Sequence, residues 1–499
     1  MVHAGPAHVA AVVGALGAPL VLVARRRVEL VAGLVLVAAA EIALVYANTG
    51  GGRLTTTVAA AAVAGVVVVA IGGWILVRRP ELVTPLVLLA APFRLPLDFN
   101  RHHRFFVAVA QGGQLGRLLP LYVVLIAAVA ALLYRLARDD DVVALPRAVA
   151  WPAAAFLALA SLSLLWSEDL PAAVNLLEFF LLPFALLVSV VARAPFPRWL
   201  PRTLAAVGVA LGCLFAVVGL WEEATHRLLF FAPKIEVSNS YASFFRVTSL
   251  FRDPSLYGRH VVLAMTVLFV PLWLRRVNVV VAGGLLALLW FGLYFSYSQS
   301  SMAALFVVVL AVVAAAGGRR ARLAVLVGVL VTVLAAAAVG AAELSHHSAR
   351  RATSDRSRRV SLTVRAWTHR PVAGVGLGAQ PRASQQLATR YAPPSHFVSH
   401  TTPLTVLAEL GVVGLLLYAA LLAGAAKAID GVRRRDMPLG LTLGMALLGL
   451  FVHSLFYSGF FEDPLTWFVL GTTAAALLAP SPEPEPVAVR PTREPVFVR

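Results

Sequence analysis

The sequence predicts an all-α, polytopic integral membrane protein with about 13–15 transmembrane helices and a large outer loop between two late spans. Of its 499 residues, 60% are hydrophobic and only 13% are charged. The mean hydropathy of +0.84 is far above that of soluble globular chains. Long apolar runs recur from residue 8 to residue 479, so we assign residues 1–479 to one transmembrane domain.

A membrane span needs about 20 apolar residues. Fifteen runs of roughly that length lie at 8–24, 28–47, 55–77, 82–97, 118–136, 147–166, 171–192, 203–221, 256–274, 278–297, 301–317, 323–342, 404–425, 437–457 and 464–479. The weakest run is 82–97, because Pro85 and Pro92 interrupt it. It is predicted to be a re-entrant or broken helix.

The positions of the basic residues predict the orientation. Arg25, Arg26 and Arg27 follow the first apolar run, which is the reverse of a cleavable signal peptide and places the N-terminus outside. Every cytoplasmic connection that results from alternation contains basic residues. These connections are Arg78-Arg79, 135–141, 193–202, Arg275-Arg276, 319–322 and 427–435. The Pro-rich segment 480–499 then becomes a disordered cytoplasmic tail.

The net charge of +18 comes almost entirely from arginine, since Lys234 and Lys427 are the only lysines. We favour biased codon usage as the cause over a functional choice of arginine in place of lysine. Because the basic residues lie in short blocks between apolar runs, they indicate membrane topology and argue against nucleic-acid binding. Cys213 is the single cysteine, which excludes an intrachain disulfide and a thiolate metal site. Neither a phosphate-binding Walker loop nor a dinucleotide fingerprint occurs.

Three predicted outer segments stand apart: 94–117, with the sequence NRHHRFF; 222–257, which contains an FRDPS turn; and the large extracytoplasmic loop 343–402. That last loop holds nine arginines and only two acidic residues. Such a basic outer loop runs against the positive-inside tendency. Either the loop is cytoplasmic, which would leave 319–322 and 427–435 outside, or its guanidinium groups bind an anion such as phosphate. We favour the second explanation, an outer loop that binds an anion. The adjacent histidine pairs His102-His103 and His346-His347 are interpreted as solvated.

The end of this loop is the expected centre of the chemistry. Gly374, Gly376 and Gly378 predict a tight loop, and the apolar run that starts at residue 404 follows after a short polar bridge. His400 stands at the junction, where an imidazole faces water on one side and the bilayer boundary on the other.

At these residues the chain resembles the O-antigen ligase and polymerase superfamily. The resemblance is carried by FRDPS, by an arginine and Trp-containing segment that ends in PVAGVGLG, and by the pattern His400, Thr401, Leu404, Glu409, Gly411 and Gly414. It is strongest over 245–425 and extends loosely through 162–184. Two positions depart from the family pattern: Thr401 stands where Asn is frequent, and Ser298-Gln299-Ser300 replaces a Ser-Arg pair.

The resemblance implies a metal-independent, C-type membrane glycosyltransferase that needs no cofactor. It implies a donor glycan on a polyprenyl diphosphate, such as undecaprenyl diphosphate, a glycan or lipid-glycan acceptor, and an active site on the outer face of the cytoplasmic (inner) membrane. His400 is then the catalytic base. Arg252 and Arg359 are the first candidates for binding the diphosphate, followed by Arg246, Arg259 and Arg365.

Each assignment has a structural alternative. His400 can cap a helix at the membrane interface, and the arginines can contact lipid headgroups. Glu409 and Tyr391 are supporting residues. In the simpler interpretation, Glu409 pairs with an arginine and Tyr391 anchors the loop. The rival functions are a transporter or flippase of a lipid-linked or anionic solute, for which no internal repeat is present, and a non-enzymatic scaffold. The sequence distinguishes neither ligase from polymerase nor one sugar or acceptor from another.

Overall fold

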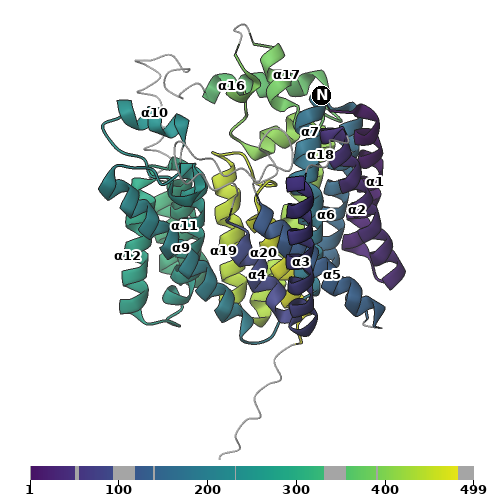
Figure 1. Cartoon of the computed structure of the whole chain (residues 1–499). Helices are drawn as coiled ribbons and strands as arrows, with labels where there is room; N and C mark the ends of the chain where they lie inside the picture. The colour runs from purple at the N-terminus through teal and green to yellow at the C-terminus, as the bar shows by residue number, and fades with distance from the viewer. Residues whose placement is uncertain are drawn as a thin grey trace, which may run out of the picture.

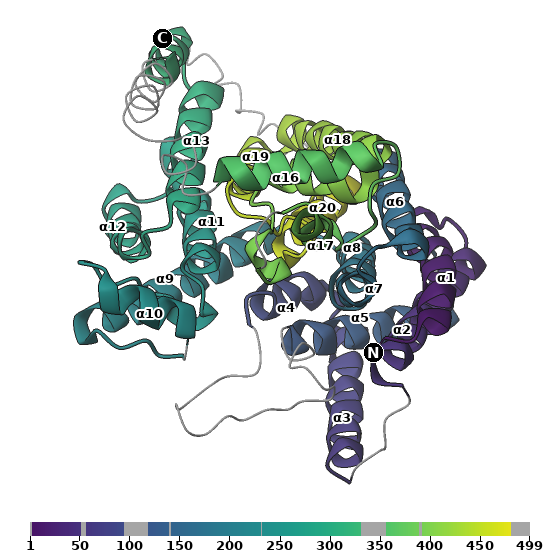
Figure 2. The ribbon, with the colours of Figure 1, turned by 90° about the horizontal axis from the view of Figure 1, so that it is seen from above.

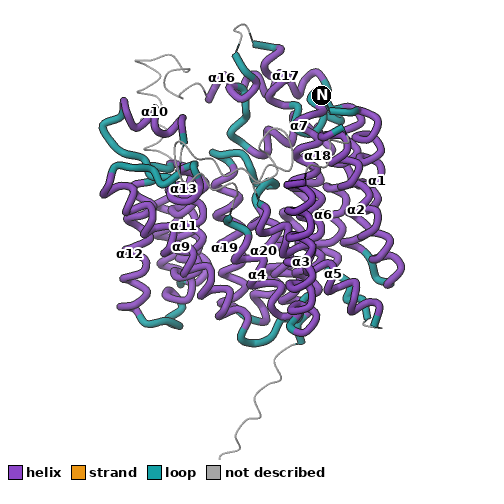
Figure 3. The backbone as a smooth tube through the Cα atoms, in the orientation of Figure 1, coloured by secondary structure: helices purple, strands orange, loops and turns teal. Residues whose placement is uncertain are grey.

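The computed structural model describes residues 2–50, 56–93, 118–138, 141–230, 232–330, 356–388 and 392–480. In this part of the chain the backbone consists of helices and loops without strands, as Figure 3 shows. The helices are α1 (Ala4–Val23), α2 (Arg27–Thr49), α3 (Thr56–Arg78), α4 (Val83–Ala90), α5 (Leu119–Ala137), α6 (Arg147–Leu162), α7 (Leu170–Leu176), α8 (Leu182–Arg193), α9 (Leu200–Thr225), α10 (Pro233–Tyr241), α11 (Pro254–Trp273), α12 (Val279–Phe295), α13 (Gln299–Ala316), α16 (Arg356–His369), α17 (Gln380–Gln386), α18 (Thr402–Arg435), α19 (Met437–Ser454) and α20 (Pro464–Leu478).

The prediction of an all-α, polytopic membrane protein is confirmed. Wherever the structure describes them, the fifteen predicted runs lie in helices, and the run 323–342 is described as helical to residue 330. Among the described residues, ten helices are long and apolar enough to cross a membrane, and two shorter apolar helices are α12 and α20. The run 82–97 belongs to a broken element, in which the chain bends by 115° between Val63–Arg78 and Pro80–Ala90.

One boundary differs from the prediction. The segment 427–435 was expected to be a connection, but it continues α18, which runs for 34 residues to Arg435. Asp430 supports this extension by pairing with Arg433 and Arg434, each at 2.7 Å. The helix ends where Asp436 accepts a hydrogen bond from the Leu439 backbone N–H and caps α19.

The helices form two groups that α19 and α4 connect. In one group α1 packs against α2 and α6, α18 packs against α6, and α20 packs against α8; in the other, α11 packs against α9, α12 and α13. Helix α19 contacts α11 and α13 on one side and α18 and α20 on the other. In the view from above (Figure 2), α16 lies across this junction, over α18 and α19. The N-terminus lies at the same end of the bundle as α16 and α17 (Figure 1).

Candidate functional site

A break in α18 receives the glycine loop that precedes it in sequence. Gly411 lies inside α18 with φ 66° and ψ −166°, a conformation essentially restricted to glycine. Hydrogen bonds across the break pair backbone groups of α18 with backbone groups of the glycine loop. Val375 N–H donates to the Ala408 carbonyl at 2.9 Å, and Val412 N–H donates to the Pro371 carbonyl at 2.9 Å. A Cβ atom on Gly411 would overlap the Val372 carbonyl oxygen, so glycine is required at this position.

The three glycines of the loop adopt positive φ angles, as predicted for a tight loop: 69° at Gly374, 95° at Gly376 and 72° at Gly378. Gly376 N–H donates to the Glu409 carbonyl at 2.8 Å. The Glu409 side chain is 7% exposed, and its carboxylate accepts a hydrogen bond from the Gln380 backbone N–H at 3.4 Å. Glu409 therefore holds the glycine loop through backbone contacts.

The other side of the glycine loop is fixed to the connection between α6 and α7. Glu168 N–H donates to the Val375 carbonyl at 3.0 Å, and Ser167 Oγ donates to the Leu377 carbonyl at 3.0 Å. Leu377 N–H donates in turn to Ser163 Oγ at 3.1 Å. The upstream segment 162–184, where the sequence resemblance was only loose, thus contacts the strongest part of the pattern.

Gln380 positions the residues that flank His400. Its side chain is fully buried, its Nε2 donates to the Phe397 carbonyl at 3.0 Å and to Thr363 Oγ1 of α16 at 3.0 Å, and its Oε1 accepts from Ser399 N–H at 2.9 Å. After His400, Thr401 Oγ1 donates to the Leu455 carbonyl at 3.1 Å. His400 is therefore held between α16, α17 and the end of α19.

His400 contacts Arg359 directly: Arg359 Nη1 donates a hydrogen bond to His400 Nε2. Because a guanidinium has no acceptor, Nε2 of His400 carries the lone pair rather than the hydrogen. Burial lowers the pKa of His400 below its ordinary value, and the positive charges of Arg359 and Arg356 lower it further. His400 is thus a neutral imidazole near pH 7, the form that can accept a proton.

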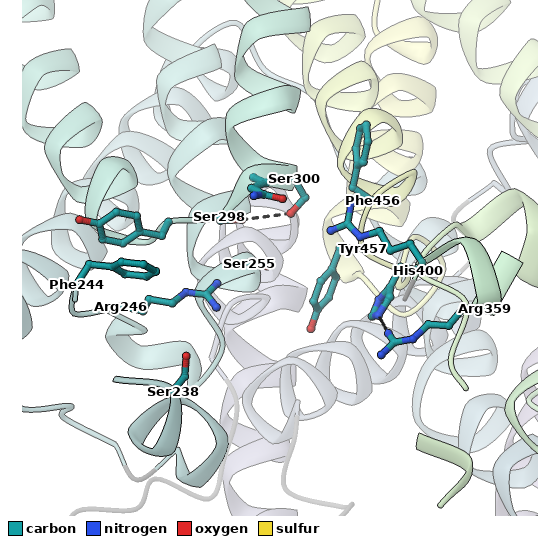
Figure 4. Close-up of a pocket in the computed structure, with 13 residues that line it drawn as sticks. Ser238, Phe244, Arg246, Ser255, Ser298, Ser300, Arg359, His400, Phe456 and Tyr457 are labelled. Atoms are coloured by element: carbon teal, nitrogen blue, oxygen red, sulfur yellow. Dashed lines mark hydrogen bonds between the residues drawn. The ribbon is translucent and has the colours of Figure 1, made fainter. Parts of the chain in front are cut away.

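Beside His400 and Arg359 lies a cavity of about 420 Å³. Its lining comes from the segment 238–255, the start of α13, α16 and the residues after α19. The lining residues are Ser238, Phe244, Arg246, Ser255, Tyr297, Ser298, Gln299, Ser300, Arg356, Arg359, His400, Phe456 and Tyr457. Figure 4 shows Phe244, Arg246 and Ser238 on one side, with His400, Arg359 and Tyr457 on the other.

The backbone around Arg246, in the segment before α11, is fixed by side-chain hydrogen bonds. Asn239 of α10 bonds both the backbone N–H (3.0 Å) and the carbonyl (3.1 Å) of Arg246. The fully buried Glu222 at the end of α9 accepts the N–H groups of Thr248 and Ser249 at 2.7 and 2.8 Å. Burial lowers the pKa of Arg246, an effect that the Asp253 carboxylate opposes.

Buried hydroxyl groups form part of the cavity lining, and one buried histidine contacts them. Ser298 and Ser300 are 1% and 6% exposed, and their hydroxyl oxygens lie 3.2 Å apart (Figure 4). His453 of α19, fully buried, places Nε2 3.2 Å from Ser300 Oγ and 3.2 Å from the Ser255 carbonyl. Since the carbonyl can only accept, Nε2 of His453 carries the hydrogen.

The structure brings some of the predicted residues together and places others apart. His400, Arg359 and Arg246 line the same cavity. Arg252 is exposed with φ 57° in the turn before α11, and Arg365 is exposed on α16; neither lines the cavity. Arg259 is 4% exposed and forms an ion pair of 2.7 Å with the buried Asp463. Tyr391 lies outside the described residues.

Several lining residues were not predicted as site residues. Arg356 precedes Arg359 by three positions and so shares its side of α16, a spacing that the sequence contained. Tyr457, whose hydroxyl donates to Asp253 Oδ2 at 3.0 Å, had no local signal. Neither had His453, which contacts Ser300 without lining the cavity. The partners Asp253 and Ser255 lie about 200 residues away in sequence. Within the described residues, no group of three or more His, Cys, Asp or Glu side chains is arranged to hold a metal ion.

Comparison with known protein families finds a match. Residues 284–419 match the family model described as O-antigen ligase. The matched segment contains Ser298–Ser300, Arg356, Arg359, the glycine loop, His400 and the break at Gly411, and it excludes the FRDPS turn and Arg246. No curated protein matches the chain at a significant level. The resemblance drawn from the motifs is thereby confirmed: the match over residues 284–419 supports the O-antigen ligase and polymerase superfamily.

Proposed function

We propose that this protein transfers a glycan from a polyprenyl diphosphate carrier to an acceptor hydroxyl, with His400 as the general base. The O-antigen ligase family supports the broader activity, a glycan ligase or polymerase in surface polysaccharide assembly. We assign the reaction to the end of the bundle that carries α16 and α17, which in our topology is the outer face of the cytoplasmic membrane. The N-terminus shares this end, and the C-terminus is then cytoplasmic.

The observation that carries the proposal is the placement of a neutral histidine in a cavity with guanidinium groups on both sides. His400 Nε2 accepts the proton of the acceptor hydroxyl. The oxygen bonds to the anomeric carbon, the bond from that carbon to the phosphate oxygen breaks, and its electron pair leaves with the lipid diphosphate. Arg246, Arg356 and Arg359 surround the cavity and stabilise that charge. A volume of about 420 Å³ suits a diphosphate and an adjoining sugar.

The contact between Arg359 and His400 couples donor binding to catalysis. In the free protein, Arg359 Nη1 occupies the Nε2 lone pair of His400, so the base is blocked. A bound diphosphate competes for the guanidinium, because charge-assisted bonds to phosphate are stronger than a bond to a neutral imidazole. Nε2 is then free for the acceptor hydroxyl, and the phosphate charge also raises the pKa of His400. Arg252 and Arg365, exposed at the same end, remain predicted donor contacts.

The test is a transfer assay with purified protein in nanodiscs, a short polyprenyl diphosphate glycan and a chelator. We expect the wild type to release the lipid diphosphate and to form a larger glycan, whose size separates single transfer from polymerisation. Arg359→Ala should weaken donor use more than Arg359→Lys, since lysine keeps the charge but loses the bidentate geometry. Movement of intact donor across the bilayer without release would instead identify a transporter.

A further inference from the structure

Two aromatic rings line the cavity beside His400 and have no role in the transfer described above. Phe244 and Tyr297 both belong to the lining, and their ring centroids lie 4.4 Å apart with a tilt of 33° between the planes. Despite this contact, Phe244 is 43% exposed. An aromatic side chain that stays open in a cavity offers its ring face to a ligand, because burying that apolar surface is favourable.

The segment between α10 and α11 turns alternate side chains toward the cavity. Phe244 and Arg246 line the cavity, whereas Phe245 between them stacks on His226, with ring centroids 5.2 Å apart and planes within 6° of each other. Figure 4 shows Phe244 beside Arg246, across the opening from His400. The open aromatic ring therefore adjoins a guanidinium that binds the diphosphate in the proposed function.

Tyr297 holds a backbone conformation that is unfavourable for an aromatic residue. Its φ angle is 47°, in the left-handed region, where glycine or asparagine would form the turn at lower cost. Backbone hydrogen bonds fix this turn: Tyr297 N–H donates to the Tyr294 carbonyl at 3.1 Å, and Val247 N–H donates to the Phe295 carbonyl at 3.2 Å. These bonds explain the turn but not the tyrosine. A strained residue whose side chain lines a cavity favours a functional role for that side chain.

We propose that Phe244 and Tyr297 form a sugar-binding subsite, on which one pyranose ring of the glycan substrate lies. A pyranose has C–H groups on its face, which pack on the negative face of an aromatic ring, and hydroxyl groups at its edge. Ser238 and Gln299 line the same cavity and offer polar groups to those hydroxyls. The subsite rests on the proposed function. Because Arg246 binds the diphosphate there, the sugar bonded to the diphosphate is the ring that reaches Phe244; a ring of the acceptor glycan shares this chemistry.

The experiment measures binding to the full-length protein in nanodiscs, so it requires no transfer. Two probes are titrated: farnesyl diphosphate, and farnesyl diphosphate that carries one N-acetylglucosamine. We expect the wild type to bind the sugar-bearing probe about fivefold to tenfold more tightly than the sugar-free probe. Phe244→Ala should lose most of this difference and bind the sugar-free probe as the wild type does. The matched control is Tyr241→Ala, an 88% exposed aromatic outside the cavity, which should bind both probes as the wild type does.

Two further variants separate loss of the ring from loss of the fold. Tyr297→Gly removes the second ring, and glycine adopts the same positive φ angle without strain. This variant should therefore fold even if Phe244→Ala does not, and it should also lose the sugar-dependent affinity. Phe244→Tyr keeps an aromatic face and should retain that affinity.

The outcomes separate the two sources of the sugar. Loss of the sugar-dependent affinity in Phe244→Ala assigns the subsite to the donor. If that affinity is unchanged, the soluble trisaccharide of N-acetylglucosamine is titrated at saturating farnesyl diphosphate, and weaker binding to Phe244→Ala than to the wild type assigns the subsite to the acceptor. Equal binding of all three probes by the wild type and Phe244→Ala would overturn the subsite. Sugar-dependent binding by a wild type that releases no lipid diphosphate in the transfer assay would refute the transfer and leave the subsite in place.

Discussion

At the scale of single residues, neighbouring positive charges decide what His400 can do. Burial removes water from the imidazole, and Arg359 and Arg356 disfavour a second proton on it. The pKa of His400 therefore lies below the ordinary value of 6.5, and the neutral form is populated at neutral pH. The same arginines line the cavity, so an anion bound there offsets part of the lowering of the His400 pKa that they cause.

The pH dependence of kcat/KM follows with a definite sign. Activity should rise with pH through the pKa of free His400, centred below 6.5, and stay flat above it. Arg356→Gln removes one positive neighbour, raises that pKa and should move the acid limb to higher pH. Initial rates of lipid diphosphate release across a pH series measure both profiles. A wild-type limb centred above 6.5, or an Arg356→Gln limb at lower pH than that of the wild type, would contradict the account.

Arg259 allows a second residue-scale test, because the sequence predicted a donor contact while the structure shows an ion pair with Asp463. Removing one partner leaves a buried charge unpaired, which costs about 3–5 kcal/mol. Arg259→Met and Asp463→Asn should each lower the free energy of unfolding by about that amount, and the double variant should lose less than the sum. Denaturant titration in mixed micelles measures this. Unchanged stability with a raised KM for the donor would instead favour direct binding by Arg259.

At the scale of elements, the break in α18 anchors the glycine loop near His400. A proline and three glycines predicted a tight loop before this helix, and the loop is there because positive φ angles are nearly free of strain only for glycine. The sequence did not predict that Gly411 breaks the helix. ExGxxG patterns are common in apolar helices, and only the packing of Val372 against Gly411 distinguishes this one.

Gly411→Ala should therefore be costly, whereas an ordinary helical glycine should not. The added Cβ meets the Val372 carbonyl, and the backbone conformation is unsuitable for alanine, so we expect a loss of about 2–4 kcal/mol. The control is Gly284→Ala in α12, where no atom lies within 4 Å of the added Cβ. There we expect a gain of about 0.5–1 kcal/mol. Denaturant titration compares the two, and equal effects would refute the role of the break.

At the scale of the whole molecule, hydropathy was sufficient to predict the architecture but not to predict the site. Apolar runs and basic blocks are local properties, so each described span could be predicted. The cavity instead combines α10, α13, α16 and the ends of α18 and α19, and the buried Ser300 that lines it contacts His453 across 153 residues of sequence. Such contacts depend on how the two helix groups meet at α19, which no local pattern encodes.

The orientation of the bundle can be tested with single cysteines in a Cys213→Ala background. His369 is exposed at the end of α16, and Arg198 is exposed at the opposite end of the bundle. In intact spheroplasts, a membrane-impermeant maleimide should label His369→Cys at once. It should label Arg198→Cys only after permeabilisation. The reverse pattern would place the candidate active site in the cytoplasm and refute the proposed outer-face reaction.

The central claim is that His400 is the base of a metal-independent glycan transfer. The most direct measurement compares wild type, His400→Ala and His369→Ala in nanodiscs with a polyprenyl diphosphate glycan and a chelator. His369 is the matched control, an exposed histidine of α16 outside the cavity. We predict that His400→Ala binds the donor and unfolds at the wild-type temperature, yet releases lipid diphosphate about 10²–10⁴-fold more slowly. Release by His400→Ala at the rate of the wild type and of His369→Ala would contradict the claim.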